Sequence, residues 1–505
     1  VRITAVCRHW RTTIIDHSCF WRFVVVFRRP GWLQLTLQRS RDTSIRIVVR
    51  DALTFTAFLQ GVLPHRNRIE FLELRIDHRD RFAAAARITP LLDAHLLSLK
   101  GLVIKICGGA FEPILPQDYK TCLLHPAQYP CLFQLDLLAV TVPWTPLLLS
   151  QLTTLSLFDC RISQAQMPAH EVFDVLRHGR RLKSIRLWNF LSGACSDYPS
   201  GSSTAIVLPD LQSLTVQDTA LWIGHFVARV QLPSTGQIHL DGRAAMDGNW
   251  HNPSTYQALL SSQLTDLPAL SSVTTVSLYI NRSSSFQNLQ CTGPQVTICS
   301  SMSTQNPFLA LSPSQLLQAS LEHTQERLRP ATVTHLSLKM LTHLVSSTVF
   351  EKFFDALPHL RSLSVASLNR LGEHYPPPLS LLQSLATPSG SAAALPTSEG
   401  EANLDLAGED SHTGGPVRCP ELKDVSFHGM SWSHGHFLDA LVGCLRKRTH
   451  GAARKMRLVS VSIIIDSLPE GEWDAKKSYF AEQMSAFASG SRFSTYTPEW
   501  MDSVL

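Results

Sequence analysis

The sequence predicts an α/β repeat protein, in which a short helical N-terminus precedes an irregular solenoid of strand, turn and helix units curved into a horseshoe. Two observations predict this class. A Leu-x-x-Leu-x-Leu pattern recurs along most of the chain, and helix-compatible stretches lie between its copies. The 505 residues are 44% hydrophobic and 17% charged, as expected for a globular chain. Stacking is required because one such unit cannot bury its own apolar face.

The clearest copy of the pattern spans residues 152–162. Leu155 and Leu157 are expected to point inward from a short strand, Cys160 to lie in the following turn and Ile162 to close the unit. Leucine-rich repeats carry Asn or Cys at that turn position, so the array is predicted to be leucine-rich-repeat-like. A chance occurrence of the pattern in a leucine-rich α/β protein is the alternative. The ten copies begin at Ile69, Leu99, Leu132, Leu152, Leu182, Leu211, Val273, Val333, Leu360 and Leu422.

Helices are expected between the strands. His170–His178 and Thr348–Leu357 place their apolar residues at helical spacing. The stretch Trp473–Phe487 has an amphipathic pattern that predicts a helix capping the array, since terminal repeats need a polar outer face.

These patterns divide the chain into four parts. Residues 1–28 form a helical N-terminal segment, and 29–385 form the repeat array, which is interrupted by a polar loop near 281–314 that is rich in Ser, Gln, Thr and Pro. Residues 386–417 are predicted to be a disordered linker, because they combine acidic residues with Ser, Gly and Pro and have few aromatic or β-branched residues. A terminal repeat and the capping helix occupy 418–505.

The N-terminal segment carries an amphipathic pattern of its own. Its apolar residues are spaced for one face of a helix, and the run Asp16-His17-Ser18 ends that helix. Phe20 and Trp21 follow as an aromatic pair expected to pack beneath it. The apolar positions are Ile3, Val6, Cys7, Trp10 and Ile14.

The run Val6-Cys7-Arg8-His9-Trp10-Arg11, followed by Phe20-Trp21, resembles the second half of an F-box. The continuation Gly31–Arg41 is similar to F-box proteins of mushroom-forming fungi, in which a leucine-rich-repeat-like region follows. The Leu-Pro and helix that open an F-box are absent, so adaptor binding is expected on the condition that the motif is completed upstream of Val1. The resemblance implies that the adaptor-binding or F-box core residues are Val6, Cys7, Trp10, Ile14 and Trp21.

The resemblance also implies a function. The protein would be the substrate-recognition subunit of a Skp-cullin-RING ubiquitin ligase, with a Skp-type adaptor and a cullin as partners and an unidentified protein as target. The alternative is a leucine-rich-repeat scaffold without a ligase role, in which the N-terminal helix serves only as a cap. Concave-face residues between the inward leucines are the candidates for target binding, namely Thr154, Ser156, Ser184 and Arg186.

Catalytic chemistry is not expected. The sequence has no Gly-x-Ser-x-Gly elbow, phosphate-binding glycine loop, dinucleotide fingerprint or His-Glu-x-x-His motif, so we predict no catalytic residues and no cofactor. His428, His434 and His436 form a histidine cluster, which we interpret as a surface loop and not as a metal site. A hydrolase on an irregular α/β fold is a further alternative that no motif favours.

Charge and cysteine content bear on partners and compartment. Residues 1–50 contain ten Arg and two Asp, a basic excess of the kind found in nucleic-acid-binding arms. Nucleic acid is not expected, because the arginines alternate with core-type residues and no nucleic-acid module is recognisable. No apolar run approaches the roughly 18 residues of a membrane span, so no membrane partner is expected. Eleven cysteines without a CxxC pair predict a reducing cytoplasmic or nuclear compartment.

Overall fold

The protein is described from a computed structural model, in which the chain forms two compact units, Val1–Asp241 and Gly242–Leu505. It is a mixed α/β protein, and the strands of each unit build a mostly parallel sheet. The residues that the structure describes are 7–26, 30–50, 55–77, 90–91, 93–107, 120–121, 126–142, 144–162, 167–195, 205–231, 236–243, 268–281, 286–303, 312–329, 331–366, 377–389, 417–430, 436–450, 458–465 and 473–495.

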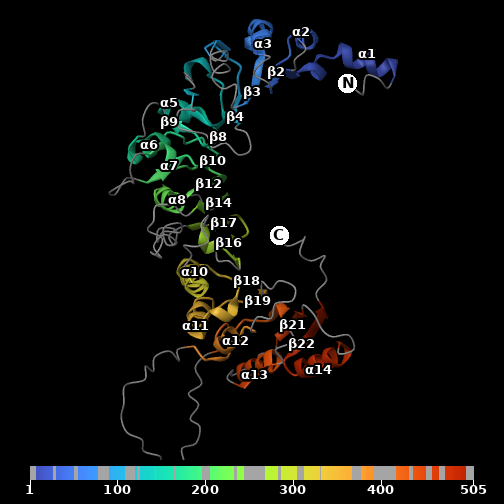
Figure 1. The fold of residues 1–505 in the computed structure, drawn as a ribbon, viewed down its shortest axis with the longest axis vertical. Coiled ribbons are helices and arrows are strands. Elements are labelled where there is room, and N and C mark those ends of the chain that lie inside the picture. The colour runs from blue at the N-terminus through green and yellow to red at the C-terminus, as the bar shows by residue number, and fades with distance from the viewer. Residues whose placement is uncertain are drawn as a thin grey trace, which may run out of the picture. The chain divides into compact units, whose positions relative to one another are not determined.

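In the first unit, the main strands follow one another in sequence order. Each strand pairs in parallel with the next, in the order β1-β2-β3-β4-β6-β8-β10-β12. Helices α6, α7 and α8 lie on one side of the strands (Figure 1). The main strands are β1 Phe23–Val26, β2 Ile45–Val49, β3 Ile69–Asp77, β4 Gly101–Cys107, β6 Gln134–Leu138, β8 Thr154–Phe158, β10 Ser184–Trp188 and β12 Ser213–Thr219. The helices are α1 Arg8–Asp16, α2 Pro30–Arg39, α3 Phe55–Val62, α5 Pro146–Gln151, α6 Ala169–Leu176, α7 Leu191–Ala194 and α8 Ala220–Val227.

Parallel pairing in register places equivalent apolar residues side by side. Leu155 of β8 aligns with Ile185 of β10, and Ile185 with Leu214 of β12. All three are at most 1% exposed. Each of the ten copies of the leucine pattern contains a main strand, because alternation of apolar and polar residues suits a strand buried on one face. The prediction of a strand at every copy is therefore confirmed.

The chain leaves three consecutive strands through the same sharp corner. Ala139, Asp159 and Asn189 each adopt a positive φ, between 47° and 56°. The corners are hydrogen-bonded in series, since the amide of Asp159 donates to the carbonyl of Trp188 at 2.8 Å and the Asn189 side-chain amide donates to Asp159 Oδ1 at 2.8 Å. Asp and Asn tolerate this left-handed region better than other residues with a Cβ. The corner turns the chain into the short strands β7 (Val140–Val142) and β9 (Arg161–Ile162), which pair in parallel as well.

Cys160 follows the second of these corners, where the sequence places it in the turn. Its thiol is fully buried and donates to the carbonyl oxygens of Leu137 and Phe158, both at 3.3 Å. Burial raises its pKa to about 12. The side chain therefore acts as a neutral hydrogen-bond donor that satisfies backbone at the corner, and not as a nucleophile.

The parallel sheet begins earlier than the sequence suggests. Strand β1 starts at Phe23, inside the range 1–28 that we predicted as a purely helical segment, and pairs in register with β2. The run Val24-Val25-Val26 favours a strand because β-branched residues fit a pleated surface. Phe20, predicted to pack under the helix, is instead 54% exposed, whereas Trp21 is buried.

In the second unit, the parallel strands pair in the order β15-β18-β19-β20-β21-β22. The helices predicted at Thr348–Leu357 and Trp473–Phe487 are confirmed here as α11 and α14, and the one predicted at His170–His178 is confirmed as α6 of the first unit. The strands are β15 Thr275–Ile280, β18 His335–Lys339, β19 Ser362–Ala366, β20 Asp424–Met430, β21 Leu458–Ile465 and β22 Ala488–Thr495. The helices are α10 Pro313–Leu328, α11 Ser347–Asp355, α12 Leu379–Ala386, α13 His436–His450 and α14 Trp473–Ser485.

The polar loop predicted near 281–314 is wrong. Strands β16 (Phe286–Thr292) and β17 (Val296–Ser303) form an antiparallel hairpin there, and β16 also pairs with β15. Alternate residues of the two strands bury apolar side chains on one face of the hairpin, although its other face is rich in Ser, Gln and Asn. Gly293 at the hairpin turn passes close to the backbone, because a Cβ there would lie 2.3 Å from the carbonyl oxygen of Ser272.

The two ends of the predicted linker 386–417 are ordered. Pro388 and Val417 form an isolated antiparallel bridge, and the Ser389 hydroxyl donates to Asp355 Oδ1 at 2.9 Å. Residues 390–416, the rest of that linker, lie outside the described residues. In the C-terminal part, α14 is followed by β22, so the expected single terminal repeat with a final helix is wrong.

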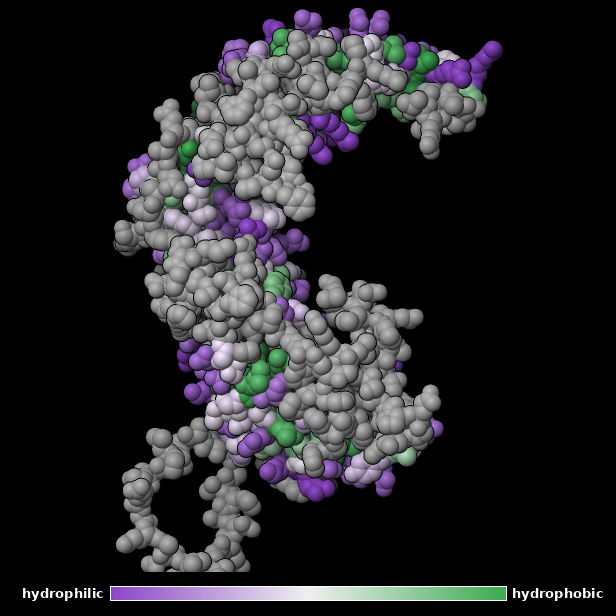
Figure 2. All heavy atoms as spheres, in the orientation of Figure 1, coloured by the Kyte–Doolittle hydropathy of each residue, from purple (hydrophilic) through white to green (hydrophobic). Residues whose placement is uncertain are grey.

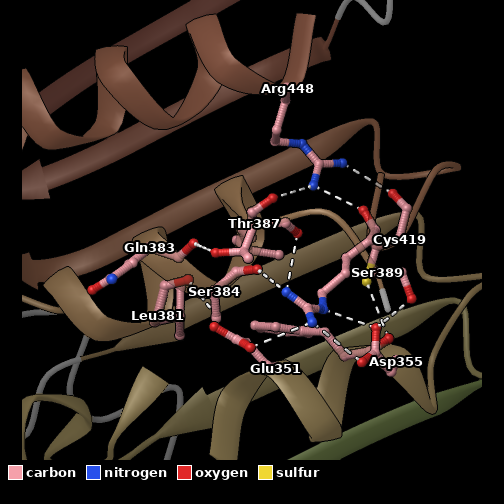
Figure 3. A network of polar contacts seen from close by, with 12 residues as sticks. Glu351, Asp355, Leu381, Gln383, Ser384, Thr387, Ser389, Cys419 and Arg448 are labelled. Carbon is pink, nitrogen blue, oxygen red and sulfur yellow. Dashed lines mark hydrogen bonds and ion pairs between the residues drawn. The ribbon is translucent and has the colours of Figure 1, made fainter. Parts of the chain in front are cut away.

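Two buried arginines join the helices around this bridge (Figure 3). The Arg418 side chain, 0% exposed, donates to Asp355 Oδ1 at 2.8 Å and to the carbonyl oxygens of Ser384 and Thr387. Arg448 donates to three carbonyl oxygens, those of Leu385, Arg418 and Cys419, at 2.9–3.0 Å. Because both guanidinium groups bond to several acceptors, they tie α11, α12, α13 and the 417–419 segment together.

Candidate functional site: the N-terminal helix and the strand face of the first unit

Helix α1 contains no buried side chain. Its start is capped by Cys7, whose Sγ accepts from the Trp10 amide at 3.5 Å. Its end is capped by the His17 amide, which donates to the Thr13 carbonyl oxygen at 3.1 Å. The helix is therefore stabilised locally, and the start of its apolar face, at Trp10, is exposed, whereas Ile14 near its end is half-buried.

Trp21 attaches this helix to the sheet. It is 7% exposed, and its indole Nε1 donates to the carbonyl oxygen of Ile14 at 2.6 Å. Its ring lies 6.0 Å from that of Trp32 on α2, and the Arg39 guanidinium lies 4.6 Å from the Trp21 ring centre. Aromatic and cation–π packing of this kind fixes the end of α1 against α2.

Exposed aromatic side chains gather in the N-terminal segment and the two elements after it. Trp10, Phe20, Phe23 and Trp32 are 49%, 54%, 58% and 38% exposed. Large aromatic residues are usually at least half buried in monomeric domains, and several exposed together mark an interaction site. All four belong to residues 1–50, the segment that contains ten Arg and two Asp.

The five residues predicted from the F-box resemblance have different environments. Trp21 is a core residue, and Ile14 is half-buried with its carbonyl bonded to Trp21. Cys7 and Trp10 are exposed on α1. Val6 lies outside the described residues. The structure thus divides the set into an anchor at the end of the helix and a solvent-facing part at its start.

The four target-binding candidates lie together on the outer face of β8 and β10. Thr154 aligns with Ser184, and Ser156 aligns with Arg186. Arg186 is exposed, and Thr154 and Ser184 are half-buried. Ser156 is only 5% exposed, contrary to the expectation of an exposed residue, because its short side chain lies between longer ones on the neighbouring strands.

Three carboxylates of the strand face, on β3 and β6, have described side chains that are each engaged by a cation. Glu70, the second residue of β3, binds Lys100 at 2.6 Å and Arg22 at 3.1 Å. Asp136 of β6 binds Lys105 at 3.0 Å. The third carboxylate, that of Glu73, pairs with Arg75 on its own strand. Hydrogen bonds from Lys100 and Ser44 hold the pKa of Glu70 below its usual range.

Two exposed cations at β10 have no carboxylate partner within the described ranges. They are Lys183, directly before β10, and Arg186 within it, and both are exposed. Figure 2 shows hydrophilic residues gathered over the strands at the level of β10 and β12. The strand face therefore carries a surplus of positive charge at β10.

An aromatic pair that the sequence analysis did not single out lies beside Arg186. Phe158 of β8 and Trp188 of β10 are aligned in register, with ring centres 5.9 Å apart, and Trp188 is 38% exposed. The alternation of the repeat already places residues 158 and 188 on the outer face, so the same period that located Arg186 could have found them.

The strand face of the second unit has a different character. A row of half-buried serines crosses five adjacent strands in register, and no large aromatic interrupts it: Ser277, Ser337, Ser364, Ser426 and Ser462. Lys339 and His428 lie one row further along, separated by Ala366. Burial, and then the charge of Lys339, lower the pKa of His428.

Nothing in the described ranges assembles a metal centre, since no three His, Cys, Asp or Glu side chains there are grouped to hold an ion. His434 lies outside those ranges, and His428 is in β20. None of the helices described combines the length and apolar character needed to cross a bilayer.

Comparison with models of known protein families finds no match, and comparison with curated proteins finds none either.

Proposed function

We propose that the chain is the substrate-recognition subunit of a Skp-cullin-RING ubiquitin ligase, acting inside the cell, in the cytoplasm or nucleus. In this proposal the F-box-like segment binds a Skp-type adaptor that connects it to a cullin. A leucine-rich-repeat-like solenoid presents a target protein, and the chain itself carries out no covalent step. The proposal extends the resemblance of Val6–Arg11 and Phe20–Trp21 to the second half of an F-box.

The observation that carries the proposal is the uncovered face of α1. A nine-residue amphipathic helix with Trp10 half exposed is anchored by Trp21 at only one end. A helix that served only as a cap would bury its apolar side chains against the first strand. An exposed aromatic face with surrounding arginines suits a partner that brings apolar contacts and acidic residues.

Support for the solenoid comes from the repetition of the unit. Strands in sequence order are neighbours, each is followed by the same corner in β6, β8 and β10, and helices lie on one side. Stacked units of this kind build extended binding surfaces on the strand side.

A pull-down with a tagged Skp-type adaptor tests the proposal. The chain is expressed both as it stands and with the coding sequence upstream of Val1, in native form and with Trp10→Ala. A matched control, Leu97→Ala, removes another exposed apolar side chain of the same unit. We expect recovery of adaptor and cullin, loss of both with Trp10→Ala, and no change with Leu97→Ala.

Absence of adaptor from both native forms would contradict the ligase proposal. The chain would then be better described as a leucine-rich-repeat scaffold without a ligase role. In such a scaffold, target binding does not depend on α1.

A further inference from the structure

The β10 region of the first unit combines three features that a binding site for an acidic peptide needs. Arg186 and Lys183 are exposed cations, and neither forms an ion pair with a carboxylate in the described part of the chain. Phe158 and Trp188 form an aromatic platform one row further along the same strands. The side chains flanking Arg186 in its row are small, Ser156 on β8 and Thr215 on β12, so its guanidinium is accessible from both sides.

Asp136, two strands away, lies in the same row as Ser156 and Arg186. Its Oδ2 binds Lys105 and its Oδ1 is buried, so this carboxylate is neutralised within the chain and is not open to a ligand. With neighbouring strands about 4.8 Å apart, Asp136 and Arg186 are separated by roughly 10 Å.

We propose that this strand face binds an acidic segment of a protein, with a carboxylate on Arg186 and Lys183 and an apolar side chain on Phe158 and Trp188. The inference rests on the proposed function, because it names the chemistry of the target that the repeats would present.

Charge complementarity favours a peptide over a nucleic acid. Glu70, Glu73 and Asp136 lie on the same face, and a phosphate backbone crossing the strands would meet them. A peptide carries its charges at separate side chains, so it can place a carboxylate at β10 and a neutral group at β6.

Fluorescence anisotropy on the full chain tests the site. The probe is a fluorescein-labelled peptide in which glutamates flank a central phenylalanine, and two control peptides replace every Glu with Gln or the Phe with Ala. We expect saturable binding of the first peptide below about 1 mM and a loss of at least about fivefold in affinity with either control. Added salt should weaken binding, because the cations are exposed.

Variants connect the binding to the residues. Combined Lys183→Gln and Arg186→Gln should weaken the acidic peptide at least about fivefold, and Trp188→Ala about threefold. Arg66→Gln is the matched control, since it removes an exposed cation that lies outside the strands of the same unit. Unchanged far-ultraviolet circular dichroism in each variant shows that these exposed substitutions leave the fold intact.

The inference is overturned if the peptide does not bind below about 1 mM, if the double variant binds as tightly as the native chain, or if a single-stranded RNA oligonucleotide binds more tightly than the peptide. Recovery of the adaptor is read separately in the same preparations. Peptide binding without adaptor recovery would support this site and reject the ligase proposal. Adaptor recovery without peptide binding would support the ligase proposal and reject this site.

Discussion

Helices α1 and α6 have nearly the same length and are both amphipathic, yet the chain uses them differently. Ala169, Val172, Phe173 and Leu176 of α6 are buried, and Phe173 packs 6.0 Å from the ring of Phe226 on α8. In α1 no side chain is buried. The apolar side chains of α6 are covered by neighbouring repeats, whereas those of α1 are not buried. The side chains of α1 are therefore available to another molecule.

The same contrast holds between two arginines. Arg418 is fully buried, and all of its hydrogen bonds go to carboxylates and carbonyls of the chain itself. Arg186 is exposed on a strand, with serine and threonine beside it. Burial with partners marks a charge that holds the fold together, whereas exposure without partners marks a charge that can bind something else.

The largest effect is expected from the buried charge. Arg418→Ala leaves Asp355 and Glu351 without their partner and opens a cavity, so we expect the free energy of unfolding to fall by about 3–5 kcal/mol. Arg361→Ala is the control, because Arg361 forms an exposed pair with Glu421 that water screens, so its loss should change stability little. Urea unfolding measured by circular dichroism checks both. Similar losses in the two variants would show that Arg418 does not join the helices.

A somewhat smaller loss in the free energy of unfolding is expected from α6, and almost none from α1. Phe173→Ala should cost about 3–4 kcal/mol through lost burial and a cavity. Trp10→Ala should change stability by less than about 0.5 kcal/mol, because the side chain is half exposed. Differential scanning calorimetry of both variants measures the difference. A loss for Trp10→Ala as large as that for Phe173→Ala would mean that α1 is a structural cap.

The smallest effect is a dependence on pH. Burial lowers the pKa of His428 in the folded state, so the folded protein binds fewer protons there than the unfolded chain. Stability that is fully present above the unfolded value of about 6.5 is therefore lost as the pH falls below it. The lowered pKa of Glu70 acts in the same direction, but only near and below pH 4.5.

Urea midpoints at pH 8 and pH 5.5 measure the histidine effect. His428→Gln should reduce the difference between them. An unchanged difference in this variant would show that His428 is not the group responsible.

The sequence was sufficient to predict the mixed α/β class and all ten strands that carry the leucine pattern, because alternate leucines have one structural solution in a half-buried strand. It missed β16 and β17, whose outward faces are so rich in Ser, Gln and Asn that composition favoured a loop. Ala139 at a positive φ was not predictable, since nothing in alanine itself favours that conformation.

The candidate site was predicted in part. The strand period located Arg186 and Thr154 on the outer face, but it could not show that Ser156 would be buried or that Lys105 would neutralise Asp136. Those outcomes depend on side chains of neighbouring strands, which come from distant parts of the chain. For the same reason the burial of Arg418 was invisible, because its partners Asp355 and Glu351 precede it by more than sixty residues.

In the proposed assembly, the exposed start of α1 faces a partner and not the body of its own chain. The most direct measurement replaces Trp10 with a photo-crosslinking amino acid and irradiates the full chain in the presence of a Skp-type adaptor, with the same replacement at exposed Leu97 as the control. We predict a crosslink to the adaptor from position 10 and none from position 97. No adaptor crosslink from position 10, or equal crosslinking from both positions, would contradict the account.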